Sequence, residues 1–143
     1  ASPWQEVGPG WESFNVTDEM GNPDSILSHY RALIRARNQH SALRVGEPSL
    51  ITTGNNGLYS ILRVSQGEAV LVLVNLAGGS IKNYRLELAT SALVGGSYTP
   101  LAIMGEGTFA PLLTNSSGGF SQYVPLPAIP PYATLILQLN LGK

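Results

Sequence analysis

Residues 69–76 read Ala-Val-Leu-Val-Leu-Val-Asn-Leu, an almost continuous run of apolar side chains. A run of this length, rich in Val and Leu, predicts a strand that is buried on both faces. The pairs Gln66-Gly67 before it and Gly78-Gly79 after it are typical of tight turns. The residues before the first turn, Leu58–Val64, alternate between apolar and polar positions. The pattern therefore predicts an antiparallel hairpin at the centre of a sheet.

Further strands are predicted on both sides of this hairpin. Residues Ile81–Leu88 alternate, with Tyr84, Leu86 and Leu88 on one face. Weaker strand patterns are Leu50–Thr53, Tyr98–Ile103, Ala110–Leu113, Tyr123–Leu126 and Thr134–Leu139. Short strands separated by Gly, Pro and Asn predict a mainly β fold, a sandwich or barrel built from antiparallel hairpins.

One amphipathic helix is predicted before the strands. Asn22 suits the N-cap, Pro23 the first helical position, and Asp24 the positive end of the helix dipole. The apolar positions recur at helical spacing and form one face, made of Ile26, Leu27, Tyr30, Leu33 and Ile34. We expect the helix to end near His40, because Gly46-Glu47-Pro48 closes the region.

The chain is therefore predicted to have two parts. Residues 1–46 are an irregular loop and one helix, which have too little to pack against on their own, whereas residues 47–143 form a self-sufficient β domain. The chain opens Ala1-Ser2-Pro3 without an initiator Met. We expect it to be a piece of a longer protein.

The composition excludes several classes of partner and site. Only 12% of the 143 residues are charged and the net charge is −1, so no basic face for nucleic acid is expected. The chain has no Cys, which excludes disulfides and cysteine zinc sites. The longest apolar run, Ala69–Val74, is far shorter than the ~20 residues of a membrane helix.

The order of motifs resembles a known family. Asn15-Val16 precedes Asn22-Pro23-Asp24-Ser25-Ile26-Leu27, and the helix carries Tyr30-Arg31 and Leu33-Ile34-Arg35-Ala36-Arg37 before Ser41-Ala42-Leu43-Arg44-Val45-Gly46. The later landmarks are Asn75-Leu76, Leu113-Thr114-Asn115, Leu126-Pro127 and Pro131-Tyr132-Ala133-Thr134. This order is similar to the last barrel helix and C-terminal β-sandwich of the α-amylase superfamily, glycoside hydrolase family 13, particularly its α-glucosidase-like members.

The resemblance implies that residues 1–46 are a remnant of the catalytic barrel and that residues 47–143 are the C-terminal sandwich domain. The family's catalytic carboxylates lie on earlier barrel strands, so it implies no catalytic residue in this chain. The implied parent is a retaining glycoside hydrolase or transglycosylase that acts on α-linked glucosides. The resemblance implies an α-glucan or oligosaccharide as the substrate of this parent. Many members bind calcium through residues that lie upstream, and no cofactor is assigned to this chain.

Trp4 and Trp11 are the candidate substrate-binding residues. Indole rings stack on sugars, and in α-glucosidase-like relatives the corresponding loop can border the substrate cleft. The alternative is that both rings fill the junction between the barrel and the sandwich. His29 and His40 are eleven positions apart, which does not match the i, i+4 spacing of a helical zinc site, so no metal ligand is predicted.

These observations leave three alternative functions. In the first, the sandwich stabilises the barrel of the same polypeptide, and the isolated fragment exposes its helix face and self-associates. In the second, the sandwich is a starch-binding-like glycan module, although it contains no Trp. The third, an independent small enzyme, is disfavoured because no convergent acid/base set is visible.

Overall fold

The computed structural model describes residues 4–142 and divides into two compact units between Arg37 and Asn38. Helix α1 (Val16–Met20) and most of helix α2 (Ile26–Gln39) belong to the first unit. The second unit contains helix α3 (Ser41–Val45) and all the strands. These are β1 (Glu47–Leu50), β2 (Leu58–Ser65), β3 (Glu68–Asn75), β4 (Leu86–Leu88), β5 (Gly96–Met104), β6 (Leu112–Thr114), β7 (Phe120–Tyr123) and β8 (Thr134–Leu141).

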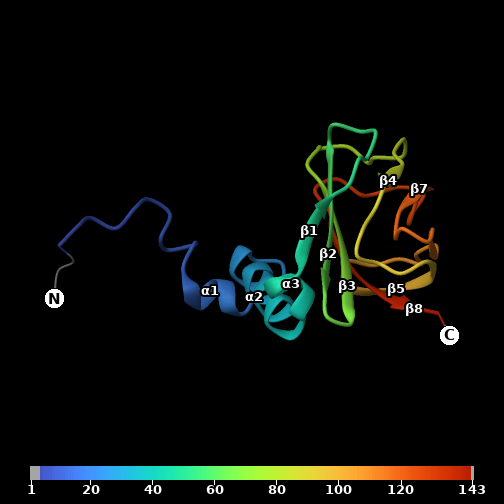
Figure 1. Ribbon diagram of the computed structural model, residues 1–143. Coiled ribbons are helices and arrows are strands. Elements are labelled where there is room, and N and C mark those ends of the chain that lie inside the picture. The colour runs from blue at the N-terminus through green and yellow to red at the C-terminus, as the bar shows by residue number, and fades with distance from the viewer. Residues whose placement is uncertain (1–3, 143) are drawn as a thin grey trace. The chain divides into compact units, whose positions relative to one another are not determined.

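The strands form two antiparallel sheets. The larger sheet has the order β1-β2-β3-β8-β5-β6, and β4 pairs with β7 in a second sheet (Figure 1). Strand β3 lies between β2 and β8, which agrees with its continuous apolar sequence. The predicted mainly β, antiparallel fold class is confirmed.

The β2–β3 hairpin matches its prediction closely. Its register pairs Ser65 with Glu68 and Leu62 with Leu71, so the loop is Gln66-Gly67. Gly67 has a φ of +77°, which a residue without a Cβ adopts without strain.

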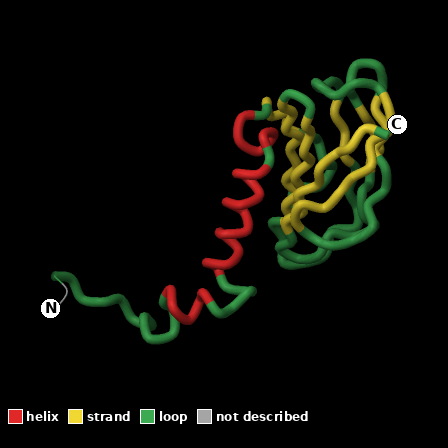
Figure 2. The backbone as a smooth tube through the Cα atoms, turned by 90° about the horizontal axis from the view of Figure 1, so that it is seen from below, coloured by secondary structure: helices red, strands yellow, loops and turns green. Residues whose placement is uncertain are grey.

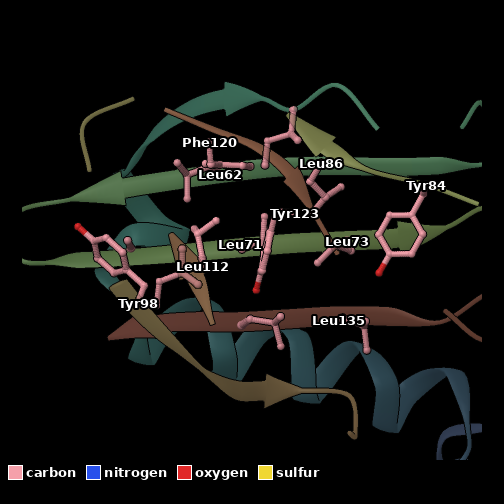
Figure 3. Close-up of a cluster of buried hydrophobic side chains, with 14 of the residues drawn as sticks. Leu62, Leu71, Leu73, Tyr84, Leu86, Tyr98, Leu112, Phe120, Tyr123 and Leu135 are labelled. Carbon is pink, nitrogen blue, oxygen red and sulfur yellow. The ribbon is translucent and has the colours of Figure 1, made fainter. Parts of the chain in front are cut away.

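The core fills the space between the two sheets. Leu62, Leu71 and Leu73 from the large sheet belong to one cluster with Leu86 and Phe120 from the small one (Figure 3). The rings of Phe120 and Tyr123 meet edge-on, with centroids 6.1 Å apart.

Two buried tyrosines in this core reach backbone oxygens. Tyr84 donates a hydrogen bond to the Leu126 carbonyl at 2.7 Å, and Tyr123 donates one to the Ala110 carbonyl at 2.7 Å. Burial raises the pKa of both hydroxyls, so they remain protonated donors at neutral pH.

Asn75 anchors the chain segment that leads into β8. Its side chain is almost fully buried, and its Nδ2 donates to the carbonyls of Gly79, Ile129 and Pro130. Its Oδ1 accepts a hydrogen bond from the Ala77 N–H at 2.8 Å. Asn75 therefore connects two landmarks of the sequence. It belongs to Asn75-Leu76, and it binds Ile129 and Pro130, which directly precede Pro131–Thr134.

Several predicted details are wrong. Helix α2 begins at Ile26 rather than after Asn22, and two further helices of five residues, α1 and α3, flank it in sequence. Asn22 caps a turn instead, because its Oδ1 accepts a hydrogen bond from the Asp24 N–H.

The strand predicted over Ile81–Leu88 is also too long, since only Leu86–Leu88 forms β4. Ile81 pairs with Ile129 in an isolated bridge. The weaker strands are present but displaced by up to three or so residues at their ends, as expected where turns rather than periodicity set the boundaries.

Candidate functional site

Trp4 and Trp11 lie before α1. Figure 2 draws the chain before the first helix as a loop. Trp4 is 91% exposed and Trp11 is 55% exposed, and Phe14 nearby in sequence is exposed as well. A turn at Gly10 orders part of the segment, since the N–H groups of Ser13 and Phe14 both donate to the Gly10 carbonyl at 2.9 Å. Within residues 4–142, no ring contact joins the two indoles. Their binding of substrate stays a prediction.

A network of polar contacts connects α1 to the start of α2. Asn15 caps α1, because its Oδ1 accepts a hydrogen bond from the Asp18 N–H at 3.0 Å. Ser25 caps α2 in the same way through the Ser28 N–H, and its hydroxyl donates to the Glu19 carbonyl. The Glu19 carboxylate accepts a hydrogen bond from the Leu27 N–H at 3.0 Å. The Asn15 and Ser25 positions of the sequence motif are thus helix caps.

Helix α2 exposes apolar side chains along one side. Ile26, Tyr30 and Ile34 are spaced by four residues, which places them on the same side of the helix. They are 71%, 61% and 56% exposed, respectively. We call these three residues the apolar α2 face.

Helix α3 is held on the β2–β3 hairpin by Glu68. Oε2 of Glu68 accepts hydrogen bonds from the Ala42 N–H at 2.9 Å and from the Ser41 hydroxyl at 2.8 Å. Oε1 lies 2.6 Å from Nδ1 of His40. On the neighbouring strand, Nε of Arg63 donates to the Ala42 carbonyl at 3.0 Å. Glu68 therefore caps a helix that is distant in sequence, and Arg63 fixes the same turn from the other strand.

The electrostatics of this contact favour the charged carboxylate. The side chains of His40 and Glu68 are only 18% and 14% exposed. Burial raises the pKa of Glu68, but the hydrogen bonds from the Ala42 N–H, His40 and Ser41 outweigh it, and the net pKa lies below its usual value of 4.5. We call Glu68, His40, Ser41 and Ala42 the α3 anchor.

The sequence pointed to neither partner of this anchor. Glu68 acts as a helix cap, but the helix that it caps begins 27 positions earlier in the sequence. No local pattern carries that information, because side-chain capping is usually judged from residues within one turn of the helix.

The structure shows no grouping that could hold a metal among the residues it describes. No set of three or more His, Asp and Glu side chains is close enough together in residues 4–142. None of the helices in that part of the chain is both long and apolar enough to span a membrane.

No family model matches the chain, but several known proteins are similar to part of it. An oligo-1,6-glucosidase of Halalkalibacterium halodurans is 34% identical over 77 residues, which are 54% of this chain and 14% of that protein. A glucan 1,6-alpha-glucosidase of Streptococcus pneumoniae is 32% identical over 75 residues, which are 52% of this chain and 14% of that protein.

A solved structure extends the similarity to almost the whole chain. The trehalulose synthase of Pseudomonas mesoacidophila superposes with a TM-score of 0.65 and 25% identity, over 96% of this chain and 22% of that chain. The chain is a homologue of glycoside hydrolase family 13 enzymes. The predicted family is thereby confirmed, and the chain spans only 14% to 22% of the length of these family 13 relatives. This share fits the predicted C-terminal piece of such an enzyme.

Proposed function

We propose that this chain is the non-catalytic C-terminal region of a family 13 glycoside hydrolase and that it stabilises the catalytic barrel of the same polypeptide. The parent is proposed to act on α-linked glucosides, as the names of the oligo-1,6-glucosidase and glucan 1,6-alpha-glucosidase relatives suggest. Catalysis itself is assigned to the part of the parent outside this chain. A calcium ion, where the parent binds one, is assigned there as well.

The observation that carries the proposal is the apolar α2 face. A helix of a globular protein normally buries its apolar stripe against the rest of the fold. Ile26, Tyr30 and Ile34 are instead more than half exposed. In the parent, we expect this face to pack against the barrel to which α2 belongs.

The α3 anchor supplies the second part of the argument. Helix α3 follows α2 after a single residue, His40, and Glu68 and Arg63 bind α3 to the sandwich. In the proposed parent, α2 belongs to the barrel, and the helix that follows it is held on the sandwich. Interfaces between domains of one chain typically bury roughly 600–1,500 Å².

The proposal is tested in the full-length parent enzyme with two substitutions at adjacent positions of α2, whose side chains point in different directions. Ile34→Ser removes an apolar contact of the proposed interface, and Arg35→Ser is the matched control on another side of the helix. We expect Ile34→Ser to lower the thermal unfolding midpoint by about 2–4 °C, with kcat/KM at 25 °C unchanged. Equal midpoints for the two variants would contradict the proposed interface.

A further inference from the structure

A polar groove of about 610 Å³ lies beside the small sheet, wholly within the second unit. Its polar lining consists of Thr52, Lys82, Asn83, Arg85, Glu87 and Gln122. None of these residues takes part in the α3 anchor or in the apolar α2 face. The groove is therefore separate from the proposed stabilising function.

Alternating burial along residues 84–87 presents two of these side chains to the groove. Tyr84 and Leu86 are buried in the core, so Arg85 and Glu87 point away from it. The backbone here is fixed, because Glu87 exchanges two hydrogen bonds with Thr52 and the Arg85 N–H donates to the Thr53 carbonyl at 2.9 Å. The groove has a rigid floor.

Gln122 adopts a costly conformation to reach the groove. Its φ is +56°, in the left-handed region that residues with a side chain rarely occupy. Its Nε2 donates to Oε1 of Glu87 at 2.6 Å. Such backbone strain persists where the surrounding structure holds it, and it is frequent in residues that serve binding. The contact orients the Glu87 carboxylate and leaves the amide oxygen of Gln122 as a second acceptor.

The groove offers donors beside these acceptors. Lys82 and Arg85 are exposed, and neither forms an ion pair with a carboxylate among residues 4–142. An anion would be attracted by these cations but repelled by Glu87. A pair of adjacent hydroxyl groups can pair with both the cationic donors and the acceptors of the groove, because each hydroxyl donates one hydrogen bond and accepts others.

We propose that this groove binds a neutral oligosaccharide, with Glu87 and Gln122 accepting from sugar hydroxyls and Lys82 and Arg85 donating to them. That the sugar is α-linked glucose rests on the proposed function. The groove has no exposed aromatic ring for stacking, so we expect a dissociation constant on the order of 1 mM.

The test is an NMR titration of the 143-residue chain with isomaltotriose, an α-1,6-linked glucose trimer, and separately with inorganic phosphate. The backbone amide signals of residues 82–87 and 122 are followed up to roughly 50 mM ligand, well above the expected dissociation constant. Saturable shifts with the sugar that are absent with phosphate support the proposal. Shifts with phosphate alone, or with neither ligand, overturn it.

Two variants give the assignment to Gln122 a matched control. Gln122→Gly relieves the strained backbone and removes the side-chain amide, so we expect the fold to be kept. The dissociation constant for the sugar, obtained from the same amide shifts, is expected to rise at least fivefold. Tyr132 has a similar φ of +54° outside the groove, and Tyr132→Gly is expected to leave binding unchanged. Equal binding by the Gln122→Gly variant and the unsubstituted chain would overturn the proposal. This test does not involve the barrel. If the groove does not bind sugar, the proposed stabilising role is therefore unaffected and is still tested by Ile34→Ser.

Discussion

Glu68 and Ala42 are 26 positions apart in the sequence, and Oε2 of Glu68 accepts a hydrogen bond from the Ala42 N–H at 2.9 Å. A strand residue thereby accepts the hydrogen bond from a first-turn N–H that a helix N-cap residue usually accepts. The contact fixes α3 to the β2–β3 hairpin, and a single residue, His40, separates α2 from α3.

Removing the Glu68 carboxylate is expected to destabilise the second unit. Glu68→Ala leaves the half-buried Ser41 hydroxyl and the buried Ala42 N–H without their acceptor, which we expect to cost about 1–3 kcal/mol of unfolding free energy. Urea denaturation followed by circular dichroism measures the change. Glu106→Ala is the control, because Glu106 is exposed. A loss no larger than that of the control would contradict the anchoring role of Glu68.

The same contact predicts an acid-sensitive contribution to stability. The pKa of Glu68 is lowered in the folded chain, so its contribution is fully present above its unfolded value, near 4.5, and is lost as the pH falls through the lower folded value. We expect the unfolding free energy to fall more steeply below about pH 4.5 in the unsubstituted chain than in Glu68→Gln. Denaturation curves between about pH 3 and 7, a range that includes the titration of carboxyl groups, provide the comparison. Parallel pH profiles for the two proteins would show that Glu68 does not carry this effect.

Asn75 is expected to be among the most sensitive polar positions of the sandwich. Asn75→Ala leaves the carbonyls of Gly79, Ile129 and Pro130 without their shared donor, at a cost of roughly 2–4 kcal/mol. Asn56→Ala provides the comparison, since Asn56 is exposed. Both unfolding free energies come from urea titrations. A loss of unfolding free energy no larger than that of Asn56→Ala would show that Asn75 does not anchor the segment before β8.

The isolated chain is expected to self-associate through the apolar α2 face. Contiguous exposed apolar side chains favour contact between molecules, and Ile26, Tyr30 and Ile34 are all exposed. Size exclusion with light scattering should show a mass that rises with concentration. Ile34→Glu should suppress the rise and Arg35→Glu should not. A strict monomer at all concentrations would contradict this prediction.

Sequence patterns predicted the parts of the fold that local chemistry determines. The β2–β3 hairpin was predicted almost residue by residue, because its apolar run and its Gln66-Gly67 turn are both local signals. The start of α2 was placed too early, because the Asn22-Pro23-Asp24 signal for a helix start serves a turn instead. The length of β4 was overestimated, because Ile81 continues the alternation but pairs only in an isolated bridge.

The contacts of the candidate sites could not be predicted from the sequence. The α3 anchor and the Gln122–Glu87 contact join residues 26 and 35 positions apart, and only the folded sheets bring them together. The left-handed backbone of Gln122 has no sequence signal either, because Gly and Asn are the residues that usually mark that conformation. Trp4 and Trp11 stand out in the sequence, but their exposure is compatible with both a substrate contact and a domain junction.

The proposed origin of this chain is tested most directly by the source gene. About 350 codons upstream of Ala1 should be sequenced, a length that holds a barrel with insertions. We expect an open reading frame that encodes the remaining strands and helices of the barrel, with three carboxylates at the ends of barrel strands. A stop codon, or a start codon just before Ala1, would contradict the account and leave a free-standing β domain.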